Sequence, residues 1–197
     1  MPEPRQLLLA STSRYRRELL ARLALRFECV DPGVAEQALP AEAAADTAER
    51  LALLKARALA ARFPHALIVG ADQVASCDGA ILGKPGTHAN AVRQLTAMSG
   101  RTVHFDTALA VLDAQSGAVN SRVVPCLVHF RRLNAAQIED YLQREQPYDC
   151  AGSAKAEGLG IALIACIDGE DPTALIGLPL IALTELLALA GMPVLRA

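Results

Sequence analysis

A short apolar run that ends in hydroxyls and then in arginines constrains the start of this chain more than any other feature. The run Leu7–Ala10 is apolar, hydroxyl residues follow at 11–13, and arginines stand at positions 14, 16 and 17. A segment with helical apolar spacing begins at Leu19. The pattern predicts a buried strand, a hydroxyl-rich turn and a helix whose first turn is cationic.

These arginines stand where a helix usually carries acidic residues, because its first turn has partial positive charge. Free backbone N–H groups at a helix start, together with guanidinium groups, are suited to bind a phosphate. The segment therefore suggests a phosphate site. A solvated basic face on a surface helix is the alternative interpretation.

The global composition limits the kinds of partner. The chain has 197 residues and a net charge of -2, so basic residues are not in excess and broad affinity for nucleic-acid polymers is not expected. Its five cysteines are scattered without zinc-site spacing, which favours reduced thiols in a cytoplasmic protein. The most apolar tail, residues 178–190, is too short to cross a membrane.

Strand and helix signals alternate along the chain and predict an α/β fold in one domain, residues 1–197. The predicted strands include a buried run that ends at Asp72, two long strands and a late strand: Leu67–Ala71, Thr102–Leu112, Val119–Phe130 and Ile161–Ile167. Capping boxes are expected at Asp46 with Glu49, opening a helix to about residue 62, and at Asn134 with Gln137. Asp78-Gly79 indicates a tight hairpin turn.

Asp72 is the strongest candidate for a catalytic residue. Small residues precede it at positions 70 and 71, and ligands of α/β sheets bind at the carboxyl ends of strands. A carboxylate there can hold a divalent cation or deprotonate a water. An aspartate that merely ends a strand is the alternative.

Lys55 lies within the apolar stripe of the long helix, so its side chain either extends outward to solvent or points into a cleft. Lys84 stands between glycine and proline, but the spacing and Pro85 exclude a P-loop. The Gly158–Gly160 stretch likewise fails the dinucleotide fingerprint. Lys155 and Glu157 lie among small residues, which suggests a loop that closes over a ligand.

Taken together, these motifs resemble the Maf family of nucleoside triphosphate pyrophosphatases along nearly the whole chain. The matching segments are LASTSRYRR from Leu9, Lys55-Ala56, Ala71-Asp72-Gln73, Gly83-Lys84-Pro85, the stretch 151–158, Asp171-Pro172 and IGLPL from Ile176. The resemblance implies an elongated mixed sheet flanked by helices, as in inosine-triphosphatase-like proteins, with two lobes around a central cleft. It also implies hydrolysis of a nucleoside triphosphate to the monophosphate and pyrophosphate with a divalent cation, magnesium or manganese.

The resemblance assigns roles residue by residue. Asp72 would be the proton acceptor, and Glu36 and Asp72 would hold the metal. Phosphates would be contacted by Ser11, Arg16, Lys55 and Lys84, with Ser13 and Lys155 near the site. The family often has a second acidic residue where this chain has Ala35, which removes one potential metal ligand.

Three positions resemble the branch of the family that acts on 7-methyl-GTP: Tyr15, Gln73 and Glu157. N7-methylation makes guanine a cation, which favours an aromatic face. A carboxylate can accept hydrogen bonds from the N1–H and exocyclic amine of guanine. The spacing of Tyr15 before Leu19 and Leu23 is equally that of a core aromatic.

Other functions are weighed against this one. A dTTP or UTP pyrophosphatase of the same family is the nearest alternative, and a non-catalytic nucleotide-binding regulator of septum formation is another. A Nudix-type enzyme is excluded because its glutamate-rich motif is absent. The apolar last helix fits either a homodimer or a buried core helix, while a membrane partner is not expected.

Overall fold

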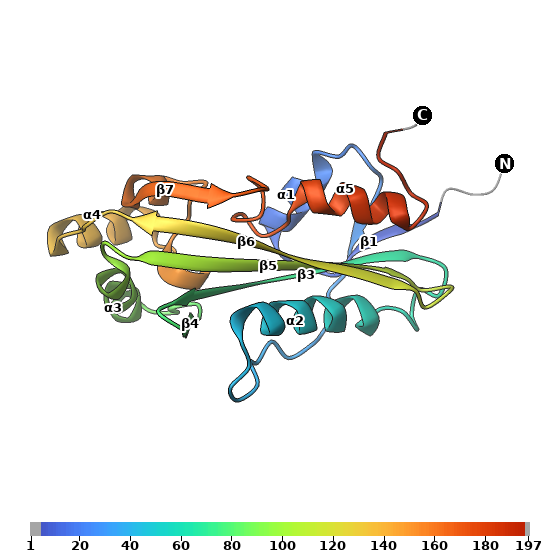
Figure 1. The fold of residues 1–197 in the computed structure, drawn as a ribbon, viewed down its shortest axis with the longest axis horizontal. Helices are drawn as coiled ribbons and strands as arrows, with labels where there is room; N and C mark the ends of the chain where they lie inside the picture. The colour runs from blue at the N-terminus through green and yellow to red at the C-terminus, as the bar shows by residue number, and fades with distance from the viewer. Residues whose placement is uncertain (1–4, 196–197) are drawn as a thin grey trace. The chain divides into compact units, whose positions relative to one another are not determined.

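The computed structural model describes residues 5–195 and has a mixed α/β fold, in which helices flank a seven-stranded sheet (Figure 1). The strands are β1 Leu7–Leu9, β2 Glu28–Cys29, β3 Leu67–Cys77, β4 Ala80–Leu82, β5 Thr102–Asp113, β6 Val119–Phe130 and β7 Ile164–Gly169. The helices are α1 Arg14–Ala21, α2 Ala44–Ala58, α3 His88–Met98, α4 Ala135–Glu145 and α5 Leu180–Leu189. Two short 3-10 turns, η1 Ala151–Ser153 and η2 Leu159–Leu163, precede β7.

The sheet runs in the order β2-β1-β3-β5-β6-β7, and β4 pairs with β3 as a hairpin. β1 is parallel to both of its neighbours, with Leu9 opposite Cys29 and Val69. β7 is antiparallel to β6, and β4 is antiparallel to β3. The α/β prediction is confirmed, and the sheet is mixed.

The chain divides into two compact units, which are described separately. Unit 1 contains the chain up to Gln73, Thr107–Val124 and the segment from Asp171 onward. Unit 2 contains Val74–Asp106 and Pro125–Glu170. The assignment of residues 1–197 to a single domain stays a prediction.

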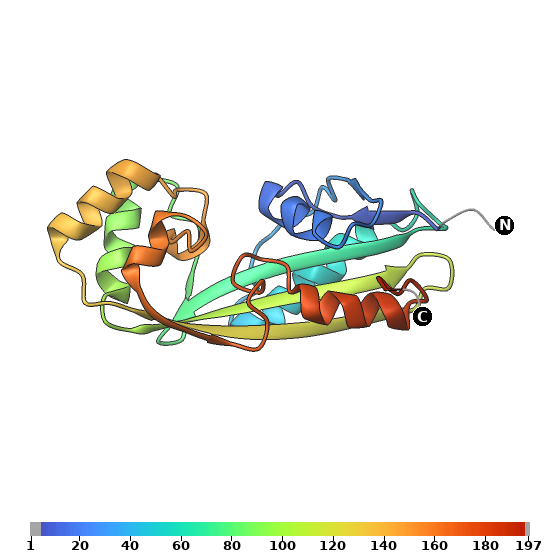
Figure 2. The same ribbon diagram turned by 90° about the horizontal axis from the view of Figure 1, so that it is seen from above.

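In unit 1, helices cover both faces of the strands (Figures 1 and 2). Residues of alternate strand positions, such as Leu67, Val69 and Ala71, form one core cluster with leucines of α1 and α5. α2 lies on the opposite face, beneath the strands in Figure 1. Because α5 contributes Leu183, Leu186 and Leu187 to this cluster, the buried-core alternative accounts for the apolar last helix.

In unit 2, α3 packs against α4 and η1, and α4 packs against η2. The predicted capping box at the start of α4 is confirmed: the side chains of Asn134 and Gln137 each accept from the other residue's backbone N–H at 2.9 Å. The Asp78-Gly79 turn is also confirmed, with positive φ at both residues.

Four predicted boundaries are wrong, one of them the end of α2, which stops at Ala58 and not at about residue 62. β3 continues through Asp72 to Cys77, because its later residues pair with β4. α2 begins at Ala44, so the Asp46–Glu49 capping box does not form; the Glu42 carboxylate, which accepts from Thr47 and Arg50, holds the chain there instead. Residues 161–163 lie in η2, so the late strand starts only at Ile164.

All five cysteines are free thiols, as the scattered spacing predicted. The pKa of every one of them is raised, mainly by burial for four and by a hydrogen bond to Asp168 for Cys166. Burial first, and then the charge and hydrogen bond of Asp149, raise the pKa of Cys150 to about 12. Among residues 5–195, no helix is long and apolar enough to cross a membrane.

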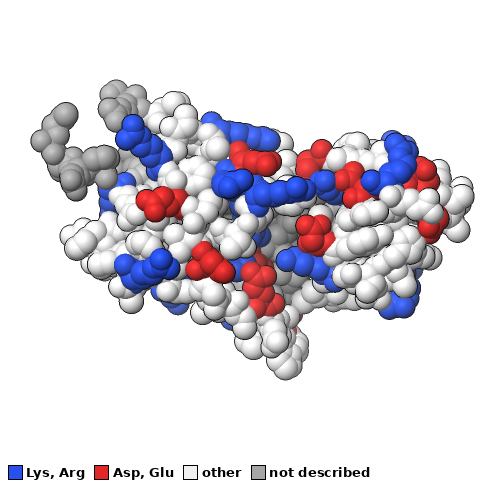
Figure 3. Space-filling view, turned by 180° about the vertical axis from the view of Figure 1, so that it is seen from behind, with Lys and Arg blue, Asp and Glu red and all other residues white. Residues whose placement is uncertain are grey.

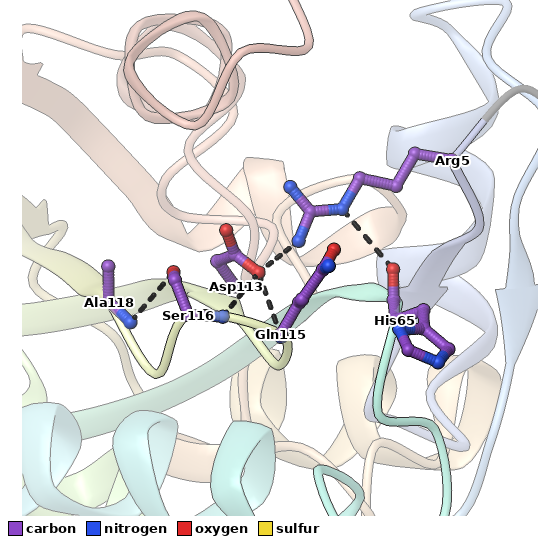
Figure 4. Close-up of polar contacts among 6 residues, drawn as sticks. All are labelled: Arg5, His65, Asp113, Gln115, Ser116 and Ala118. Atoms are coloured by element: carbon purple, nitrogen blue, oxygen red, sulfur yellow. Dashed lines mark hydrogen bonds and ion pairs between the residues drawn. The ribbon is translucent and has the colours of Figure 1, made fainter. Parts of the chain in front are cut away.

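An aspartate organises the turn between β5 and β6 (Figure 4). One carboxylate oxygen of Asp113 accepts hydrogen bonds from the backbone N–H groups of Gln115 and Ser116 at 2.9 and 3.2 Å, and from the Arg5 guanidinium. Arg5 also donates to the carbonyl of His65 at 3.2 Å. Together these bonds lower the pKa of Asp113 to about 2, the contact with Arg5 being the largest cause.

We expect Asp113→Asn to lower the free energy of unfolding by about 1 kcal/mol at pH 7, a value reduced by partial solvent exposure of the pair. A carboxyl whose pKa is lower in the folded than in the unfolded chain stabilises the fold above the unfolded pKa. This stabilisation is lost as the pH falls from about 5 towards 2. Urea denaturation at pH 7, above that window, and at pH 2.5, near its lower end, measures the difference, which should be much smaller at the lower pH. A difference independent of pH would show that the Asp113 charge does not stabilise the turn.

Candidate active site in unit 1

A glycine in β3 brings α2 against the sheet. A Cβ atom built on Gly70 would lie 2.1 Å from the carbonyl oxygen of Ala52 and 2.8 Å from the backbone nitrogen of Ala56. Only a residue without a side chain permits this approach. Because side chains alternate along a strand, Asp72 points to the same face as Gly70 and therefore towards α2.

Lys55 extends from this close contact to the predicted catalytic residue. Its ammonium donates to a carboxylate oxygen of Asp72 at 2.6 Å and pairs with Glu36 at the same distance. The Lys55 and Asp72 side chains are 3% and 9% exposed, whereas that of Glu36 is 50% exposed. Lys55 is thus buried between two carboxylates, and the alternative in which it extends outward to solvent is wrong.

Asp72 lies within β3 and not at its end as expected. It does, however, lie beyond the end of the neighbouring strand β1. β1 ends at Leu9, opposite Val69, and the N–H of Ala10 donates to the Val69 carbonyl at 2.8 Å. Asp72 therefore lies three residues beyond the last paired position of β1. Asp72 therefore lies next to the carboxyl end of β1, where the chain turns into α1. Ligands of α/β sheets bind at such strand ends.

The turn after β1 has the predicted structure. Ser13 caps α1 by accepting the N–H of Arg16 at 3.4 Å, and the buried Ser11 hydroxyl accepts the N–H of Ser13 at 3.1 Å. The first turn of α1 has no acidic residue. A cationic helix start is therefore confirmed, while phosphate binding by Ser11 stays a prediction.

Arg16 is directed by a backbone carbonyl far along the sequence. Its Nε–H donates to the oxygen of Gly177 at 2.9 Å. Burial lowers the pKa of Arg16, and the nearby negative charges of Asp72 and Glu36 act in the opposite direction. Four charged side chains of unit 1 thus share one electrostatic environment: Arg16, Lys55, Glu36 and Asp72.

Gln73 and Tyr15, which the resemblance assigns to substrate specificity, contact protein groups. The Gln73 amide nitrogen lies within hydrogen-bonding distance of the Thr107 hydroxyl and of the carbonyls of Ala174 and Leu175, at 2.8, 3.0 and 3.1 Å. The Tyr15 hydroxyl accepts from Arg14 at 2.7 Å, and the Arg14 guanidinium lies 4.7 Å from the Tyr15 ring centre. Tyr15 is half-buried and lies outside the unit 1 core cluster described above.

The remaining predicted residues belong to unit 2. Lys84 is exposed in the loop between β4 and α3. α3 holds that loop on both sides of the lysine, because Gln94 donates to the Gly83 carbonyl at 2.9 Å and Asn90 donates to the Pro85 carbonyl at 2.8 Å. The loop conformation around Lys84 is therefore defined within unit 2.

Lys155 and Glu157 have different surroundings. The Lys155 ammonium donates to Glu145 at 2.7 Å, and this contact is the main cause of the lowered Glu145 pKa. The second oxygen of Glu145 accepts the N–H of Leu159 at 2.7 Å, which fixes the start of η2. Glu157 is exposed on the loop between η1 and η2. Lys155 thus has a structural ion pair, and a contact of Glu157 with a base stays a prediction.

The carboxylates of Glu36 and Asp72 are suitable ligands for a hard divalent cation. Each has an oxygen 2.6 Å from the same Lys55 nitrogen, so the two oxygens are no more than 5.2 Å apart. Within residues 5–195 there is no cluster of three acidic, histidine or cysteine side chains that could bind a metal alone. This donor set fits Mg²⁺ or Mn²⁺ held by one or two carboxylates together with substrate phosphates.

Sequence reasoning missed the residues that surround Arg16 and Gln73. Gly177 has a φ of +109°, and an added Cβ would lie 3.6 Å from the Arg16 Nε. Thr107 is fully buried and donates to the Ala174 carbonyl at 2.9 Å. A glycine inside the Ile176–Leu180 motif was visible in the sequence, but a threonine within a long strand gives no local signal.

Figure 3 shows the molecule from behind relative to Figure 1, and on this face Lys and Arg side chains are interspersed with Asp and Glu. This mixture agrees with the small net charge of the chain. The charged cluster of unit 1 is therefore a local feature rather than part of a broad basic surface.

We expect Gly70→Ala to destabilise the protein by at least about 2 kcal/mol, because the new methyl group overlaps the backbone of α2. The displaced helix should also carry Lys55 away from Asp72. Gly83→Ala is the matched control, since nothing lies within 4 Å of a Cβ there. Thermal unfolding of the two variants provides the comparison, and equal stability would contradict the tight contact between α2 and β3.

Comparison with known proteins identifies the family. Residues 6–190 match the family described as Maf-like protein. A Methylobacillus flagellatus relative named 7-methyl-GTP pyrophosphatase is 58% identical and covers 96% of this chain and 98% of its own length. A Polaromonas relative of the same name is 56% identical and covers 97% of this chain and 87% of its own length.

A solved structure adds a likeness in fold. The HAM1 protein from Coxiella burnetii covers 81% of this chain and 91% of its own, with a TM-score of 0.50 and 15% sequence identity. At that identity the likeness concerns the fold alone. The family match and the close relatives span nearly all of the chain, and on these grounds it belongs to the Maf family.

Proposed function

We propose that this protein hydrolyses 7-methyl-GTP to 7-methyl-GMP and pyrophosphate, and so removes a modified nucleotide from the cytoplasmic pool. The observation that supports a catalytic role most directly is the buried contact of Lys55 with Asp72 and Glu36. A buried ion pair is seldom a net gain in stability over apolar residues of similar size. The position of this one, beside Arg16 and the cationic start of α1, fits a site for a polyphosphate.

Asp72 has the chemistry to accept the proton of the attacking water. Lys55 holds its carboxylate in place through the 2.6 Å contact. Arg16, oriented through Gly177, would neutralise charge that grows on the leaving pyrophosphate. Ser11, Ser13 and the helix start would bind phosphate oxygens, and Lys84 from unit 2 keeps its predicted phosphate role.

A divalent cation would complete this chemistry. Glu36 and Asp72 would hold Mg²⁺ or Mn²⁺, which when bound stabilises negative charge on the phosphates and lowers the pKa of a bound water. The missing acidic side chain at Ala35 leaves Glu36 to supply the carboxylate from that loop. Lys55 would then move from Glu36 towards a phosphate, since its flexible stem allows both contacts.

Two other functions give different outcomes. A dTTP or UTP pyrophosphatase would use the same charged cluster with another base. A non-catalytic regulator of septum formation would bind nucleotide without turnover, and it would have no need of a buried carboxylate held by a lysine. The names of the close relatives favour the methylated purine substrate.

We expect pyrophosphate release to be fastest, by kcat/KM, with 7-methyl-GTP in a panel that includes GTP, dTTP and UTP. Release should stop when EDTA removes divalent cations and resume with magnesium or manganese. Similar kcat/KM values for 7-methyl-GTP, dTTP and UTP would contradict the predicted base preference. Binding without any release would favour the regulatory function.

Glu157→Gln should lower the preference for 7-methyl-GTP over dTTP by about tenfold. An amide presents one acceptor and one donor to the guanine edge, where the carboxylate presents two acceptors. Glu170→Gln, an exposed change in the same unit, should leave the preference unaltered. Steady-state kinetics of both variants with 7-methyl-GTP and dTTP measures the preference. An unchanged preference in Glu157→Gln would show that Glu157 does not contact the base.

Asp72→Asn should reduce kcat by about 10²- to 10⁴-fold while the protein remains folded, because the amide cannot accept the proton of water. Asp46→Asn on the exposed first turn of α2 is the matched control and should retain wild-type turnover. Pyrophosphate release and thermal unfolding are measured on the same samples. Retained activity in a folded Asp72→Asn protein would show that the water is activated elsewhere.

A further inference from the structure

The orientation of Arg16 depends on a short segment before α5. The Arg16 Nε–H is bonded to the carbonyl of Gly177, and this bond connects residues 161 positions apart. Gly177 is closely packed against the guanidinium, since an added Cβ would lie 3.6 Å from Nε. Any movement of the Gly177 backbone therefore moves the acceptor that directs Arg16.

Gly177 is in turn tied to Ala174. The N–H of Gly177 donates to the Ala174 carbonyl at 2.9 Å, which closes a tight turn. Earlier in the chain, the buried Asp171 carboxylate accepts the N–H groups of Thr173 at 2.9 Å and of Ile181 at 2.7 Å. The segment between Asp171 and α5 is consequently held at both ends, and its middle is held at Ala174.

The Ala174 carbonyl is fixed by two side chains from the sheet. The Thr107 hydroxyl donates to it at 2.9 Å, and the Gln73 amide lies 3.0 Å away. The Gln73 amide also donates to the Thr107 oxygen at 2.8 Å, so the hydroxyl both accepts and donates. Thr107 has no exposed surface, so solvent water has no direct access to replace its hydroxyl.

We propose that Thr107 is a positioning residue for Arg16, acting through Ala174 and Gly177. The inference rests on the proposed function, because it assigns Arg16 a role in binding the triphosphate. Gln73 takes part in the same chain of bonds, so it would also affect turnover through the segment 174–177. A misplacement of about 1 Å at a group that stabilises a transition state can cost up to about 10² in rate.

Three single variants test the hydroxyl. Thr107→Val keeps the shape of the side chain and removes both hydrogen bonds, so kcat/KM for 7-methyl-GTP should fall about tenfold. Thr107→Ser restores the hydroxyl and should stay within about threefold of the wild type. Thr96→Val is the control, because it removes an exposed hydroxyl-to-carbonyl bond of 2.8 Å on α3 in unit 2.

A double variant tests whether Thr107 acts through Arg16. Arg16→Lys keeps the positive charge but lacks the Nε–H that binds Gly177, and it should change the same kinetic parameter as Thr107→Val. In the Arg16→Lys background, Thr107→Val should then cause little further loss. If the two losses multiply, or if Thr107→Val lowers thermal stability and leaves kcat/KM at the value of Thr96→Val, the inference is overturned.

Hydrogen–deuterium exchange separates this inference from the proposed function. Without any ligand, peptides covering residues 171–179 should exchange faster in Thr107→Val than in Thr107→Ser. Equal exchange would show that the hydroxyl does not hold the segment, whatever the activity. A wild-type protein that releases no pyrophosphate from 7-methyl-GTP would overturn the proposed function, while the exchange experiment would still decide whether Thr107 fixes the segment.

Discussion

The contact between the backbones of α2 and β3 at Gly70 is the constraint on which the charged cluster depends. It places the helix close enough for Lys55 to reach Asp72 and Glu36 while remaining buried. A larger residue would separate the layers, and the lysine would lose the carboxylates that offset the cost of burying its charge. The absence of a side chain at one position thus determines the geometry of three charged ones.

The two faces of β3 contact different parts of unit 1. Asp72 faces α2 and its lysine, whereas Gln73 faces the segment that precedes α5. Adjacent residues of one strand therefore serve the carboxylate site and the backbone that directs Arg16. The alternation of side chains along a strand allows both tasks within a single dipeptide.

Local signals in the sequence predicted two elements correctly but failed at the start of α2, where the Asp46–Glu49 capping box does not form. The Asn134–Gln137 capping box and the Asp78-Gly79 turn formed as expected, because each depends on residues only a few positions apart. The predicted strand end at Asp72 was wrong, because the later residues of β3 pair with β4 and the strand continues to Cys77. The bond from Arg16 to Gly177 could not be predicted from spacing, since it joins distant segments. The family motifs named Arg16, Lys55, Glu36 and Asp72, and the structure places them in one electrostatic environment.

The raised pKa values of the free cysteines bear on the reactivity of their thiols. Thiolates, and not thiols, attack peroxides, disulfides and alkylating reagents. Every cysteine has a raised pKa, and that of Cys150 is about 12, so the thiolate form is scarce at neutral pH. The raised pKa values thus lower the thiolate fraction of all five cysteines, including the exposed Cys29 and Cys166.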